Sequence, residues 1–106
     1  MIRHIVLFNL QPNLGPADRE RLFGQIEGLA KIPSVKRLVV GKLLEPHEDW
    51  YRPRMATDYS WALTMEFDNE DALYAYQQDS YHVTVAQEIR ERFSEIKVMD
   101  FEGVPQ

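Results

Sequence analysis

Residues 59–67, YSWALTMEF, alternate between large apolar side chains and small or polar ones, which is the pattern of a β-strand with one buried face. Three further segments are rich in strand-forming residues: 1–10 (MIRHIVLFNL), 34–44 (SVKRLVVGKLL) and 95–102 (EIKVMDFE). The sequence therefore predicts four strands, and the segments that connect them decide the fold.

Two helical regions separate these strands. Pro16 suits a first helical position, and the residues after it, up to Pro33, carry an apolar stripe at helical spacing: Leu22, Phe23, Ile26, Leu29 and Ala30. The second region begins after Asn69, a good N-cap residue, and resumes at 82–93 with another apolar stripe. We expect a break or kink between its two parts, at residues 79–81.

The order strand, helix, strand, strand, helix, strand predicts an α+β ferredoxin-like β-α-β-β-α-β sandwich. Its four-stranded antiparallel sheet carries both helical segments on one face. The 106 residues fit one domain, which we place at residues 1–103 with residues 104–106 as a tail. Because the strands carry apolar residues in both registers, the second sheet face also needs a cover, and pairing of two sheets in a homodimer is the simplest one.

Composition excludes several classes of function. The net charge is −5 and the basic residues are scattered, which argues against nucleic acid and anionic membranes as partners. The chain has no cysteine, so it has neither disulfides nor thiolate catalysis. No stretch approaches the ~20 apolar residues that span a bilayer. We expect a cytoplasmic protein that uses no cofactor.

Two histidines and one tyrosine are the candidate functional residues. His4 lies among apolar residues of the first strand, and His82 lies on the apolar stripe of the last helical segment, so both imidazoles are expected to point inward. Tyr76 meets His82 only if the helix breaks between them. A neutral imidazole that removes a proton beside a carbonyl, and a phenol that holds the resulting oxyanion, suffice for cofactor-free enolate chemistry. The alternative is that all three are core residues.

The segment 45–58 is the one long loop that the sequence predicts, and its role is open. Its run His47-Glu48-Asp49 has no ligand spacing for a metal ion, so we expect no metal site. Arg52 and Arg54 either clamp a carboxylate at a pocket mouth or are solvated charges.

The opening MIRHIVLFNL, the central DYSWALTMEFDNEDALYAYQQDSYH and the closing IKVMDFE resemble the Dabb family, the stress-responsive dimeric α/β-barrel domains. The resemblance covers nearly the whole chain. It implies a ferredoxin-like protomer, a dimer whose two sheets close into a barrel, and a cavity in each protomer. Polyketide cyclases of the olivetolic acid cyclase type belong to this family and run a cofactor-free aldol cyclisation. Their catalytic histidine and tyrosine correspond to His82 and Tyr76, and a further pocket histidine to His4.

The chain also departs from the family pattern. Asp79 and Ser80 replace the usual His-Pro, and Trp61 stands where the cyclases have another pocket histidine, which leaves less room for a long polyketide. We expect a small, largely apolar ligand in a protomer cavity with His82, Tyr76 and His4 as the catalytic residues. The expected ligand-binding residues lie on the inward registers of the same elements: Trp61, Phe8, Leu63 and Ile89.

The reaction class that these residues indicate, if the protein is an enzyme, is that of a lyase, cyclase or isomerase. Two alternatives stay open, because a shared fold is only an analogy for function. One is a non-catalytic stress or structural protein, and the other is a cofactor-free monooxygenase or haem-handling relative of the same fold.

Overall fold

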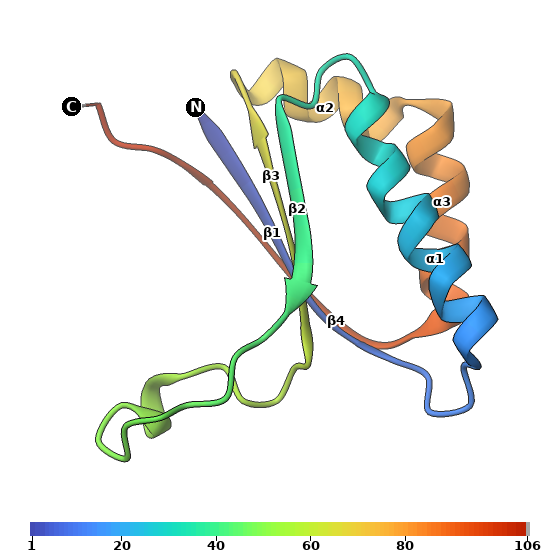
Figure 1. Cartoon of the computed structure of the whole chain (residues 1–106). Helices are drawn as coiled ribbons and strands as arrows, with labels where there is room; N and C mark the ends of the chain where they lie inside the picture. The colour runs from blue at the N-terminus through green and yellow to red at the C-terminus, as the bar shows by residue number, and fades with distance from the viewer. Residues whose placement is uncertain (106) are drawn as a thin grey trace.

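The computed structural model describes residues 1–105 and has the expected ferredoxin-like order of elements, β-α-β-β-α-β, with the second helical region in two parts. The elements are β1 (Ile2–Leu10), α1 (Pro16–Gly28), η1 (Leu29–Lys31), β2 (Arg37–Lys42), η2 (Arg52–Arg54), β3 (Trp61–Phe67), α2 (Glu70–Gln78), α3 (Ser80–Arg92) and β4 (Phe93–Glu102). The antiparallel sheet has the strand order β2-β3-β1-β4, and the helices cover one of its faces (Figure 1). No helix within residues 1–105 is long and apolar enough to cross a membrane.

The core lies between the helices and one face of the sheet, here called the inner face. Alternate residues of β1 are buried against the helices: Ile2, His4, Val6 and Phe8. The alternation predicted for residues 59–67 is confirmed, because Leu63, Met65 and Phe67 of β3 are buried on this same face. The period of two in the two central strands therefore fixes which side of the sheet the helices cover.

The opposite, outer face of the sheet is uncovered in the protomer. Its apolar residues come from all four strands: Ile5, Leu7, Val39, Ala62, Met99 and Phe101. Ile5 and Leu7 are only partly buried, and Val39, Met99 and Phe101 are 45–53% exposed. An apolar face of this kind is typical of an interface.

The predicted break in the second helical region is confirmed at Asp79. This residue has extended backbone angles (φ −63°, ψ 135°), so α2 ends at Gln78 and α3 begins at Ser80. Two side-chain caps stabilise the new helix starts: Asn69 accepts a hydrogen bond from the Ala72 amide, and Asp79 accepts one from the Tyr81 amide. α3 begins at Ser80, two residues before the start that the sequence predicts. It ends at Arg92, because Phe93 is already the first residue of β4.

Tyr81, just after the break, ties α3 to α1. Its hydroxyl donates a 2.9 Å hydrogen bond to the Gln25 carbonyl, and its ring end lies against Gly28. A Cβ atom at Gly28 would overlap the Tyr81 hydroxyl, whereas a Cβ atom at Gly24, one turn earlier, would meet nothing within 4 Å. The close approach of the two helices therefore depends on Gly28 and not on Gly24.

This difference predicts opposite outcomes for two alanine substitutions in α1. Gly24→Ala should raise the free energy of unfolding by up to about 1 kcal/mol, because alanine favours a helix. Gly28→Ala should give no gain or a loss, because the new methyl group displaces the Tyr81 hydroxyl and removes a hydrogen bond worth roughly 1 kcal/mol. Urea unfolding of both variants checks this, and an equal gain in the two would contradict the packing described.

Candidate functional site

His4 lies at the centre of the sheet, in β1, opposite Met65 of β3 and Asp100 of β4. It is buried, with 8% of its surface exposed, and its Nδ1 atom is hydrogen bonded to the Asp100 carboxylate. A carboxylate oxygen only accepts hydrogen bonds, so Nδ1 carries the proton. This partner satisfies the polar edge of an imidazole that otherwise lies among apolar side chains.

The structure brings the rings of His4, Tyr76 and His82 together. The Tyr76 ring centroid lies 4.3 Å from that of His82 and 6.0 Å from that of His4. Tyr76 is 3% exposed and also packs on Phe67 at 5.2 Å. The phenol is therefore flanked by two imidazoles at the boundary between α2 and the inner face of the sheet.

The break at Asp79 makes this arrangement possible and also orients His82. In an unbroken helix the Gln77 carbonyl would accept from the Tyr81 amide, but that amide donates to the Asp79 side chain. The freed carbonyl instead accepts a 3.0 Å hydrogen bond from Nδ1 of His82. Because a carbonyl only accepts, the proton of a neutral His82 sits on Nδ1 and the lone pair is on Nε2.

The surroundings keep both groups neutral near pH 7. Burial lowers the pKa of His82 below its usual 6.5, and the nearby His4 lowers it further, against the opposing effects of Gln77 and Asp79. Burial, with a smaller contribution from Asp100, raises the pKa of Tyr76 well above its usual 10.0. The site therefore offers a neutral imidazole that can accept a proton and a phenol that keeps its proton to donate a hydrogen bond.

The rings of His4, Tyr76 and His82 line none of the described pockets. A pocket of about 190 Å³ shares with the site only Gln77 and Asp100, the partners of the two histidines, and its lining also holds the carboxylates of Glu70 and Glu102. Binding sites for drug-sized ligands are larger, at roughly 300–1,000 Å³. The structure therefore brings the three rings close to one another but not around a described cavity.

The residues expected to line one cavity with the histidines lie elsewhere. Phe8 and Leu63 are core residues with 0% and 3% exposure, and Ile89 packs against the core. These three residues line none of the described pockets, because their side chains are used in core packing. Of the four, only Trp61 lines a described pocket.

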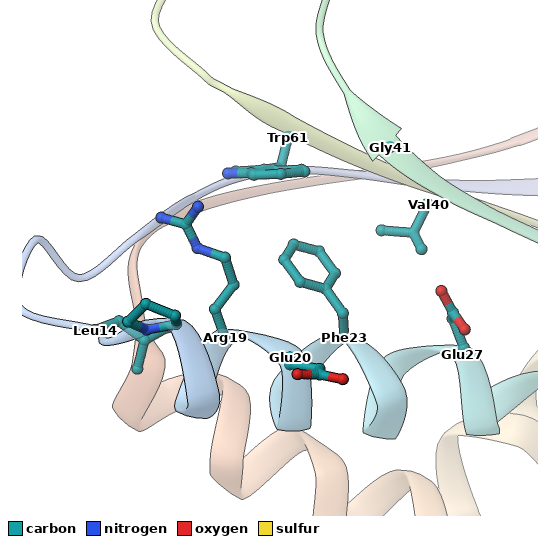
Figure 2. A pocket seen from close by; sticks show the side chains of 9 residues that line it. Leu14, Arg19, Glu20, Phe23, Glu27, Val40, Gly41 and Trp61 are labelled. Atoms are coloured by element: carbon teal, nitrogen blue, oxygen red, sulfur yellow. The ribbon is translucent and has the colours of Figure 1, made fainter.

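The pocket of Trp61 lies between α1 and the β2–β3 end of the sheet and has a volume of about 500 Å³. Figure 2 shows Arg19 and Phe23 extending from α1 toward Trp61 and Val40 of the sheet. The Trp61 ring lies 4.8 Å from that of Phe23, and the Arg19 guanidinium carbon lies 6.0 Å from its centroid. The pocket combines an apolar floor with one cation, Arg19, and two carboxylates, Glu20 and Glu27, in its lining.

Two groups of the site were not predicted from the sequence, the carboxylate of Asp100 and the carbonyl of Gln77. The Asp100 carboxylate could have been found, because it shares a register with Ile96 and Val98 and its strand pairs with β1 in this fold. The Gln77 carbonyl has no signal in the sequence, since any residue supplies a carbonyl. Arg52 and Arg54 donate to carbonyls of their own loop, those of Pro46 and Trp50.

Several solved structures of other proteins are similar to this one. A dimeric ferredoxin-like protein of unknown function from Thermobifida fusca is 27% identical, with a TM-score of 0.74 over 94% of this chain and 88% of that one. A Dabb family protein with a ferredoxin-like fold from Mesorhizobium loti is 21% identical (TM-score 0.77, 98% of this chain and 97% of that one). A hydroxynitrile lyase from Passiflora edulis is 19% identical (TM-score 0.81, 98% and 96%).

No curated protein matches the sequence significantly. The family model for the stress-responsive A/B barrel domain, by contrast, matches residues 2–103, which is nearly the whole chain. The chain thus belongs to the Dabb family of stress-responsive A/B barrel domains.

Proposed function

We propose that this Dabb domain is a homodimer that performs cofactor-free acid–base chemistry on a small carbonyl compound. One observation carries the proposal: the Nδ1–H of His82 is held by the Gln77 carbonyl while its ring contacts Tyr76. The basic Nε2 therefore belongs to a partly exposed imidazole that packs on the buried, protonated phenol of Tyr76. A base and a hydrogen-bond donor placed together are what enolate formation needs.

The proposed step is a proton transfer. Nε2 of His82 takes a proton from the carbon beside the carbonyl, and the electron pair of that C–H bond forms the enolate double bond. The charge that develops on the carbonyl oxygen is held by the hydroxyl of Tyr76. Return of the proton to another carbon completes an isomerisation, and attack of the enolate carbon on a second carbonyl completes a cyclisation. The pair of His4 and Asp100 supports the far side of the phenol.

The family relationship supports this reaction class without defining it. One structural relative is a hydroxynitrile lyase, but at 19% identity the likeness extends to the fold alone. The pocket of about 190 Å³ next to Gln77 and Asp100 favours a substrate of a few heavy atoms. A small carbonyl compound fits both observations.

The outer face of the sheet supports the homodimer. Val39, Met99 and Phe101 expose about half of their surfaces on this face. Two relatives of the same fold, at 27% and 26% identity, are dimeric. Packing of two such faces against each other would remove this apolar surface from water at roughly 25 cal/mol per Å².

A second candidate function is binding without chemistry in the pocket of Trp61. That pocket, of about 500 Å³, is larger than the one beside His82 and is lined by Phe23, Val40 and Trp61. It is also within the usual size range for small-molecule sites. A neutral aromatic molecule would pack on the aromatic floor, and the carboxylates of Glu20 and Glu27 beside Arg19 disfavour an anionic one.

The acid–base proposal predicts that the protein speeds exchange of the proton beside a carbonyl. Exchange in D2O, followed by NMR with butanone and phenylacetaldehyde as probes, should slow by about 100-fold or more in His82→Gln. Tyr76→Phe should slow it by about 100-fold, because the oxyanion loses its donor. Tyr59→Phe serves as the matched control and should leave the rate unchanged. Equal exchange in wild type and His82→Gln would contradict the proposal.

The lowered pKa of His82 predicts a pH dependence of stability. As the pH falls below 6.5, the unfolded chain binds the proton before the folded chain does, so the free energy of unfolding decreases. The contribution of His82 to the free energy of unfolding is fully present above pH 6.5. Urea unfolding between about pH 5 and pH 7.5 should show a smaller acid loss in His82→Gln than in wild type. Parallel curves for the two proteins would show that His82 is not held neutral by the fold.

The binding candidate predicts saturable uptake of a neutral aromatic molecule. In a Trp50→Phe background Trp61 is the remaining tryptophan, so its fluorescence should change on titration with N-phenyl-1-naphthylamine. Val40→Glu should weaken binding by about tenfold or more, since a carboxylate at this position disrupts the apolar floor. Val39→Glu, on the outer face, is the control for binding. Identical affinities in the two glutamate variants would exclude this pocket.

A further inference from the structure

Strand β4 is exposed on both of its faces. All residues from 94 to 102 are exposed, although the strand pairs along its length with β1. On the inner register, Ile96 and Val98 are 49% and 51% exposed, while their pairing partners Phe8 and Val6 are buried. The helices therefore cover β1 and leave the inner face of β4 open. Packing of two outer faces in a dimer would not cover Ile96 and Val98.

The loop 44–58 is a second apolar surface without a partner in the protomer. Leu44, Trp50 and Tyr51 are 82%, 69% and 50% exposed. The loop extends away from the rest of the protomer, on the side of the sheet opposite the helices (Figure 1). Its tip is ordered by its own contacts: the rings of Trp50 and Tyr51 lie 5.2 Å apart, and Arg54 donates a 2.9 Å hydrogen bond to the Trp50 carbonyl.

We infer that the loop 44–58 of each protomer packs over the inner face of the partner subunit's β4. The inference rests on the homodimer proposed above and adds a second contact surface to it. In this arrangement Trp50 and Tyr51 cover the partner's Ile96 and the partner's Val98. Because the contact is made twice by a two-fold axis, each chain supplies one loop and receives one.

The placement of the two surfaces supports this contact. Packed sheets lie about 10 Å apart, so a loop that extends beyond the outer face has to pass beside the sheet of the partner. β2, which leads into the loop, and β4 are the two edge strands of the sheet. Edge strands with unpaired backbone groups are where one chain meets another.

On both surfaces, apolar residues are followed along the chain by charged residues, and the charges are of opposite sign. On the loop, the aromatic pair Trp50 and Tyr51 is followed by the exposed cations Arg52 and Arg54. On the inner register of β4, the apolar residues 96 and 98 are followed by the carboxylates of residues 100 and 102. Apolar surface therefore faces apolar surface, and positive charge faces negative charge.

This contact would place the partner's loop next to the site described above. Asp100, which holds His4, is one inner-register position beyond Val98 and has 35% of its side chain exposed. A loop seated on β4 would exclude water from this carboxylate and strengthen its bond to His4. The site of one protomer would then be completed by the other.

The absence of cysteine from the chain makes a direct test possible. The double variant Trp50→Cys with Val98→Cys should shift, under mild oxidation, to a disulfide-linked species of twice the monomer mass on a non-reducing gel. A mixture of the two single variants should give the same covalent dimer, which shows that the bond joins two chains. Tyr51→Cys with Ile96→Cys is a second pair in case the first does not fold.

The matched control is Trp50→Cys with Gln87→Cys, since Gln87 is exposed but lies on α3 and not on β4. This pair should stay monomeric on the same gel. Sedimentation of the reduced proteins measures whether the chain is a homodimer, independently of whether the loop contact forms. A dimer in which neither test pair crosslinks overturns the loop contact and leaves the homodimer. A monomer without crosslinks overturns both, and crosslinking within one chain or equally in the control overturns the loop contact.

Discussion

The arrangement of the candidate site depends on one interruption of a helix. At Asp79 the backbone turns to an extended conformation, and the Asp79 side chain takes the Tyr81 amide. The Gln77 carbonyl that loses this amide becomes the acceptor for His82. A single capping interaction of roughly 1 kcal/mol therefore has two consequences: it places His82 over Tyr76, and it decides which nitrogen of His82 is the base.

A second constraint comes from β1, the strand that carries His4. It lies between β3 and β4, so its inner residues face the helices and its outer residues face the uncovered side of the sheet. The inner face accepts a histidine only because β4 brings Asp100 directly opposite it. An imidazole in this position without a carboxylate would be a buried polar group with an unsatisfied edge, at a penalty of about 1–3 kcal/mol.

Features that depend on local sequence were predictable, and features that depend on packing volume were not. Alternation in residues 59–67 gave the inner face of β3, and the polar run at 79–81 gave the helix break. The fold class followed from the order of these elements. The use of Phe8 in core packing, where a ligand contact was expected, did not, because it depends on how Phe8 stacks on Phe93, a residue distant in sequence.

The separation of the two pockets bears on what each can do. The site of Tyr76 and His82 holds two neutral groups, and the pocket that shares Gln77 and Asp100 with it is lined by three carboxylates, so an anionic substrate would be costly to bind there. The pocket of Trp61 instead combines aromatic side chains with Arg19, Glu20 and Glu27 and has no histidine in its lining. Proton transfer from a neutral carbonyl compound suits the first environment, and retention of a neutral aromatic molecule suits the second. The two pockets share no lining residue, so each can hold its own ligand without contact to the other.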